Sequence, residues 1–204
     1  MSNQFIRQFD DATSKFAGTD TPAKEYTVKV LAIRGYANVG APGNDFGIYD
    51  DLIVICIGDE THPFKASTDP GIFYIKNPMN PKGCAVLTEA VHYFKPGKHD
   101  GEPAFVQAES VLVYRLDKDG EIAGKSWLAS SLNLHCGSGL GAGGAGDDVG
   151  QLSAGCQIIY NPPGYFQGDE SAPWYQFYEL LSGALKKYGQ KVFPYKLIAA
   201  GDMV

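Results

Sequence analysis

Two stretches, LNLHCG at 132–137 and QLSAGCQIIY at 151–160, decide the fold that we expect for this chain. Apolar residues alternate in both stretches, at Leu132 and Leu134 and again at Ile158 and Tyr160, which predicts two β-strands. His135 lies at the end of the first predicted strand, and Cys156 lies at the start of the second. Since a glycine-rich run connects the two, we expect them to be neighbours that bring this histidine and this cysteine together.

A cysteine next to a histidine is a candidate catalytic pair. A thiol is a weak nucleophile until a neighbouring imidazole takes its proton, and a catalytic thiol of lowered pKa reacts quickly with electrophiles at neutral pH. Ala154 and Gly155, just before Cys156, are small enough for a close approach of the backbone. Amide groups around the cysteine are therefore predicted to form an oxyanion hole.

The composition predicts one ordered domain of 204 residues that is mainly β with a few helices. The chain has a mass of 22.0 kDa, 25 Gly and 12 Pro, and 44% of its residues are hydrophobic. We expect residues 1–25 to form a lead-in with a short helix, 26–160 a β core that holds the active site, and 161–204 a C-terminal helix and tail.

Charge and cysteine usage exclude several classes of function. The net charge is −6 and the pI about 5.1, so the basic surface that binds nucleic acid is missing. No signal peptide is recognisable at the N-terminus and no apolar run is long enough to span a bilayer, so we expect a soluble protein made in the cytoplasm. The four cysteines, at positions 56, 84, 136 and 156, show no CxxC spacing and are predicted to be reduced.

The order of predicted elements suggests an antiparallel meander followed by a helix. We expect a polar loop at 95–101 and a long loop at 36–51. A helix is predicted at 5–16, and strands at 27–33, 52–57, 72–75, 84–87, 105–107 and 111–116.

The C-terminal helix has the clearest pattern. We predict Ser171 as its N-cap and Pro173 in its first turn, with Lys186, Lys187 and Gly189 at its end. Its apolar face, which we expect to pack on the sheet, consists of Trp174, Phe177, Tyr178, Leu181 and Leu185.

Three other interpretations of the central stretch are weaker. Gly139-x-Gly141-x-x-Gly144 matches a dinucleotide fingerprint as a string, but no βαβ unit surrounds it. Papain-like peptidases place the cysteine before the histidine in the chain, whereas all four histidines precede Cys156. A zinc site with His135, Cys136 and Cys156 lacks a fourth ligand beyond Asp147 or Asp148. We expect the glycine run at 137–150 to gate access to the pair.

The central stretch resembles a known catalytic signature. His135, seventeen intervening residues and then Ser153-Ala154-Gly155-Cys156 is similar to the motif of the L,D-transpeptidase (YkuD-like) catalytic domain family. The upstream turn Thr68-Asp69-Pro70-Gly71 resembles the turn that precedes the motif in that family. Phage and bacterial proteins with Ser-Ala-Gly-Cys-Gln also carry a Gly-Lys-His-x-Gly segment, here Gly97–Gly101. The resemblance covers roughly residues 26–160.

This resemblance implies an L,D-transpeptidase-like β-sandwich or barrel that acts on peptidoglycan stem peptides through a thioester on Cys156. It implies His135 as the base and the backbone carbonyl of Cys136 as the group that orients its imidazole. The second histidine of the family is replaced here by Ala154. Further oxyanion or substrate contacts are assigned to Ser153, Gly155, His99 and Thr68.

We expect no cofactor and no metal. The resemblance implies a site of action in the periplasm or cell wall, and without a recognisable signal peptide we expect this site to be reached through cell lysis or dedicated export. The alternative is a wall-binding or structural module that keeps the fold and has lost the chemistry.

Overall fold

The computed structural model describes residues 2–17, 19–38, 44–122, 126–137, 148–162 and 169–203. Most of the expected gate at 137–150 thus lies outside the described residues. Asp147 and the glycine fingerprint at 139–144 lie wholly outside them. Within the described parts, no helix is long and apolar enough to cross a membrane.

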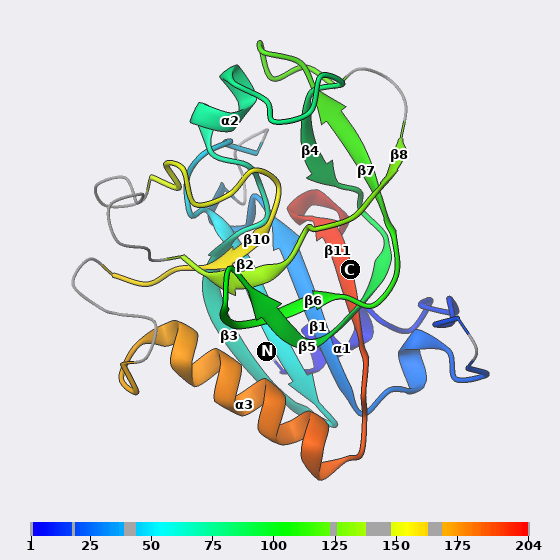
Figure 1. Cartoon of the computed structure of the whole chain (residues 1–204). Coiled ribbons are helices and arrows are strands. Elements are labelled where there is room, and N and C mark those ends of the chain that lie inside the picture. The colour runs from blue at the N-terminus through cyan, green and yellow to red at the C-terminus, as the bar shows by residue number, and fades with distance from the viewer. Residues whose placement is uncertain are drawn as a thin grey trace.

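Eight strands close into a mixed β-barrel, which confirms the prediction of a mainly β protein with a few helices (Figure 1). In their order around the barrel, the strands are β1 (Val28–Arg34), β11 (Phe193–Ala199), β5 (Val91–His99), β6 (Glu102–Gln107), β9 (Leu134–Cys136), β10 (Gln157–Ile159), β3 (Glu60–Ser67) and β2 (Asp51–Ile57). The pairs β1–β11 and β9–β10 are parallel, and the others are antiparallel. The predicted antiparallel meander is therefore wrong in its topology.

A small antiparallel sheet lies beside the barrel, in the order β4 (Cys84–Leu87), β7 (Val111–Leu116) and β8 (Trp127–Ala129). The helices are α1 (Ser2–Arg7), α2 (Ile72–Lys76) and α3 (Pro173–Lys187), with short 3-10 turns at Ala23–Glu25, Tyr36–Asn38 and Ala200–Asp202. In Figure 1 the small sheet and α2 lie at the end of the molecule opposite α3.

Strand β1 shows how the barrel is covered on both faces. Val30 and Ala32 belong to the same core cluster as the apolar face of α3. Leu31 and Ile33 point the other way and pack with Phe9 and other residues of the N-terminal segment. All seven residues of β1 are therefore buried, because each face of the strand has an apolar cover.

Helix α3 carries the apolar face that the sequence predicts, but its cap differs. Trp174, Phe177, Leu181 and Leu185 are buried in the barrel core. The N-cap residue is Ala172 rather than Ser171, because the Ser171 hydroxyl donates to the Asp169 carboxylate at 2.6 Å instead of capping the helix. The predicted N-terminal helix is also shorter than expected, and ends at Arg7.

Two predicted elements are wrong. Residues 72–75 belong to helix α2 and do not form a strand. The helix begins directly after Pro70-Gly71, with Gly71 as its N-cap. The predicted polar loop at 95–101 is the far half of β5, which runs to His99 and pairs with β6. Of β5, only residues 91–94 pair with β11, so Pro96 lies in the part of β5 that has a neighbouring strand on one side only. Such a position tolerates proline.

Candidate active site

The parallel pairing of β9 and β10 brings the predicted histidine and cysteine together. His135 lies opposite Ile158, and Cys156 immediately precedes β10. Side chains alternate along β9, so Leu134 and Cys136 enter the barrel core while His135 faces the other way. Two adjacent strand ends therefore position the thiol and the imidazole from a rigid sheet.

The His135 ring is fixed by its neighbour in the chain. Its Nδ1 lies 2.9 Å from the backbone carbonyl oxygen of Cys136, which is the contact that the resemblance implies. Since a carbonyl only accepts, Nδ1 carries the proton and Nε2 holds the free lone pair. Nε2 is buried and has no hydrogen-bond partner among the described residues. The ring thus presents an unprotonated nitrogen, the form that a general base needs.

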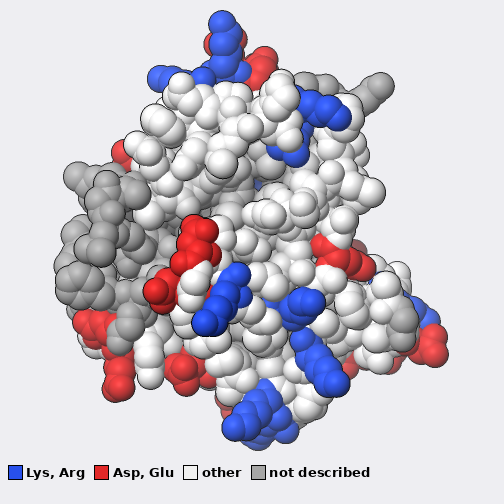
Figure 2. Space-filling view, viewed as in Figure 1, with Lys and Arg blue, Asp and Glu red and all other residues white. Residues whose placement is uncertain are grey.

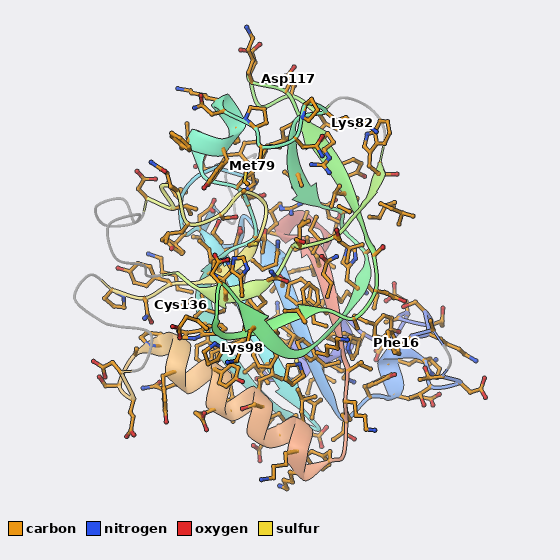
Figure 3. All side chains as sticks on the ribbon, viewed as in Figure 1. Phe16, Met79, Lys82, Lys98, Asp117 and Cys136 are labelled. Atoms are coloured by element: carbon orange, nitrogen blue, oxygen red, sulfur yellow. The ribbon has the colours of Figure 1, made fainter. Side chains whose placement is uncertain are left out.

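The thiol of Cys136 lies in the barrel core, away from the candidate site. Its sulfur accepts a hydrogen bond from the side-chain amide of Asn161 at 3.4 Å. Figure 3 shows Cys136 on the side of the strands that is nearer α3. Only the backbone of this residue contributes to the candidate site.

A second imidazole completes the cluster. His99 lies at the tip of the β5–β6 hairpin, where Asp100 and Gly101 form a two-residue turn with φ of 50° and 87°. Its ring centroid is 4.6 Å from that of His135, at an interplanar angle of 37°. One ring nitrogen from each histidine and the sulfur of Cys156 all lie within 4.8 Å of one another. The structure therefore brings together three of the predicted site residues.

Asn133 connects these groups, although the sequence reasoning missed it. Its backbone N–H donates to the Cys156 sulfur at 3.4 Å, and its side-chain amide lies 3.0 Å from Nδ1 of His99. Its carbonyl accepts from the amide of Gln157 at 2.8 Å. Asn133 immediately precedes β9 and lies two residues before His135, so their shared face could have been predicted from the extended pattern of this stretch.

Burial determines the electrostatics of the pair. The Cys156 side chain is 8% exposed, and burial raises the pKa of its thiol to about 11. Burial, with a smaller contribution from His99, lowers the pKa of His135 to about 4. Both groups are therefore neutral near pH 7, and the lowered thiol pKa expected from the sequence is absent from this structure.

Ser153 and Gly155 shape the turn before Cys156. The Ser153 hydroxyl donates to the Cys156 carbonyl at 2.8 Å and accepts from the Gly155 amide at 3.1 Å. Gly155 has φ of 128°, and a Cβ atom there would lie 2.5 Å from the carbonyl oxygen of Ala85. Because the Gly155 amide is already bonded, the amides of Ala154 and Cys156 are the candidate oxyanion donors.

A cavity of about 450 Å³ leads to the thiol. It lies between the barrel and the small sheet, and its walls include Tyr74, Met79, His99, Arg115, Leu152 and Cys156. Ser131 forms part of the same wall with an unusual backbone φ of 67°, and its carbonyl oxygen is 3.7 Å from the Cys156 sulfur. A small acyl substrate could reach the sulfur from this side.

Thr68 lies outside the cavity walls, so the predicted substrate contact does not fit the structure. It is fully buried, and its amide donates to the Asp51 carboxylate at 2.5 Å. Its hydroxyl accepts from Nε of Arg34 at 3.1 Å, and its carbonyl accepts from Gln157 at 3.3 Å. With these partners, Thr68 supports the strand that carries the cysteine instead of binding substrate.

The donor set also bears on metal binding. His99, His135 and Cys156 are nitrogen and sulfur ligands of the kind that zinc prefers, and three protein ligands suit a catalytic zinc. This set differs from the one weighed on the sequence, because the Cys136 thiol points into the core. A soft metal bound here would block the thiol, so activity assays require a chelator control.

Comparison with known proteins gives no match: no family model, no curated protein and no solved structure is significantly similar to the chain. The motif and the geometry of the site are therefore the features that indicate a function.

Proposed function

We propose that this protein is a cysteine-dependent acyl transferase or hydrolase of the L,D-transpeptidase type, acting on peptidoglycan stem peptides. The observation that carries the proposal is the placement of the Cys156 sulfur within 4.8 Å of a nitrogen of His135, at the end of a cavity. The hydrogen bond from His135 to the Cys136 carbonyl and the mixed barrel are consistent with the same class. A wall substrate implies action in the periplasm or cell wall.

The proposed reaction begins from the neutral pair. Nε2 of His135 takes the thiol proton as the sulfur of Cys156 attacks the scissile carbonyl carbon. The oxyanion that forms is stabilised by the amides of Ala154 and Cys156. The protonated His135 then gives its proton to the departing amine, the C–N bond breaks, and a thioester remains. Water or an acceptor amine then attacks the thioester carbonyl carbon while Nε2 of His135 removes the proton of the attacking group. The C–S bond breaks, the acyl product leaves, and His135 returns the proton to the Cys156 sulfur, which restores the neutral pair.

We assign to His99 the role of the family histidine that Ala154 replaces. Its ring contacts that of His135 but comes from the β5–β6 hairpin instead of the cysteine turn. We assign it to the substrate or the oxyanion, because the Cys136 carbonyl already orients His135. The motif thus lacks the histidine before Gly155, but the imidazole of His99 lies next to His135.

The second candidate function is a wall-binding module without chemistry. It is favoured by the raised pKa of Cys156 and by its low exposure, since inert cysteines are usually buried and protonated. The two candidates differ in whether the sulfur ever becomes acylated.

Trapping of the acyl-enzyme tests the proposal. The protein is incubated with purified stem peptides and chelator, quenched in acid and mapped by mass spectrometry. We expect an acyl adduct on Cys156, present in Cys84→Ala and absent from Cys156→Ala. Cys84 is a matched control, because its thiol lines the same cavity. Peptide turnover by Cys156→Ala would refute the proposal, and binding of wall fragments without any adduct would favour the second candidate.

A further inference from the structure

The cavity that leads to Cys156 contains an arginine to which the proposed reaction assigns no role. Arg115 extends from β7 of the small sheet into the cavity wall. It is the only lysine or arginine among the described residues that line this cavity. Arg115 therefore determines which charge the cavity accepts.

The guanidinium of Arg115 is incompletely satisfied by the described residues. A guanidinium carries five N–H donors and a positive charge. One terminal nitrogen donates to the carbonyl of Gly83 at 3.1 Å, which holds the group in place. Its Nε is buried without a hydrogen-bond partner, and no carboxylate in the described parts forms an ion pair with it. Arg115 as a whole is only partly buried. Its buried Nε–H donor is costly without an acceptor, which an oxygen of a bound ligand would supply.

The opposite charge lies at the rim of the cavity. Asp100 carries the only carboxylate among the described lining residues, and its side chain is 91% exposed, near His99. An anionic substrate group would be repelled from Asp100 and attracted to Arg115. In Figure 2, uncharged residues cover most of the middle of the visible face, with Lys and Arg mainly toward its upper and lower ends. The cavity thus has a polarity, with positive charge on the side of the small sheet.

We propose that Arg115 binds a free carboxylate of the substrate while the scissile carbonyl lies at Cys156. This assignment rests on the proposed acyl transfer, and it specifies the substrate as a peptide with a carboxylate close to the bond that is cleaved. Planar guanidinium groups bind carboxylates through two parallel hydrogen bonds, so Arg115 selects geometry as well as charge.

Binding to the Cys156→Ala protein tests this without any turnover. The probes are Nα-acetyl-L-lysyl-D-alanine and the same dipeptide as its carboxamide, with affinities measured by NMR titration. We expect the acid to bind roughly 10- to 100-fold more tightly than the amide, the range for a charged hydrogen bond. The additional change Arg115→Gln should bring this ratio close to one, and Arg115→Lys should keep part of it.

Lys82→Gln provides the matched control. Lys82 belongs to the same end of the molecule as Met79, as Figure 3 shows, but it packs over the ring of Trp127 and is not among the cavity-lining residues. We expect this variant to keep the full preference for the acid, which excludes a general effect of lost surface charge.

Several outcomes overturn the proposal. Equal binding of acid and amide by the Cys156→Ala parent does so regardless of whether Arg115 variants fold. An unchanged preference in Arg115→Gln, or its equal loss in Lys82→Gln, does so as well. If Cys156 never becomes acylated but the Arg115-dependent preference holds, the carboxylate site stands and the proposed enzyme function fails.

Discussion

A pH titration of the Cys156–His135 pair tests how the site works. Near pH 7 both groups are neutral, because burial raises the pKa of the thiol to about 11 and lowers that of the imidazole to about 4. Turnover then requires neutral His135, which is present above about pH 4 and lost as the pH falls through that value. We expect a rate that is nearly constant from about pH 5 to pH 9 and that decreases about tenfold per pH unit below about pH 4.

The magnitudes show why a resting thiolate is not expected. The difference between the two pKa values corresponds to ~10 kcal/mol for moving the proton from sulfur to imidazole. The two charges would lie within 4.8 Å of each other, so their attraction offsets ~3–5 kcal/mol at an effective dielectric constant of ~20. The ion pair should therefore make up less than ~10⁻³ of the resting protein.

Two measurements check this reasoning. The ultraviolet absorbance of a thiolate, taken as the difference between wild type and Cys156→Ala, should be absent at pH 7 and develop only toward pH 11. Alkylation of Cys156 by iodoacetamide at pH 7 should be ~10² times slower than that of free cysteine, because the thiolate fraction is smaller by about that factor. A thiolate signal at pH 7, with an apparent pKa below 7, would refute the neutral-pair mechanism.

Three further predictions concern single side chains. His135→Ala should lower peptide turnover by at least ~10²-fold with little change in stability, and a wild-type rate would mean that another group is the base. Gly155→Ala should cost ~3 kcal/mol in urea unfolding, from its positive φ and from a Cβ atom 2.5 Å from a β4 carbonyl. Gly101→Ala, with φ of 87° but open space around it, should cost only ~1 kcal/mol, and equal losses would contradict the role of the close contact. Arg34→Met should reduce the free energy of unfolding by ~3–5 kcal/mol, because buried Asp69, 3.2 Å away, loses its partner, and adding Asp69→Asn should restore part of this loss.

Local patterns predicted strands that are runs of apolar residues, and they failed where tertiary pairing decides. β1, β2, β4 and β7 follow from runs of branched residues, each within one residue of its bounds. β11 was missed because its run FPYKLIA contains Pro194 and a lysine, which weaken a local strand signal. Its place between β1 and β5 depends on partners 99 to 165 residues distant in the chain.

The residues of the candidate site also fall into two groups, those that a local sequence pattern predicts and those that only the tertiary structure places there. Cys156 and His135 could be predicted, because a thiol, an imidazole and the small residues beside the thiol form a pattern within one stretch of chain. Asn133 lies in that stretch, and strand periodicity alone would have placed it on the histidine face. Arg115 has no such signal, since it reaches the cavity only because the small sheet packs beside the barrel.

The misread segment at 95–101 has the largest consequence for the chemistry. As a solvated loop it would leave His99 free to move, whereas the structure holds this residue at the tip of a tight hairpin, with its ring 4.6 Å from that of His135. Two imidazoles at this distance cannot both carry charge at low cost, so His99 contributes to the lowered pKa of His135. The hairpin thereby adds to the effect of burial, which is the larger cause of the lowered pKa of His135. A backbone pairing that local sequence could not reveal thus helps to set the protonation state on which the proposed acyl transfer depends.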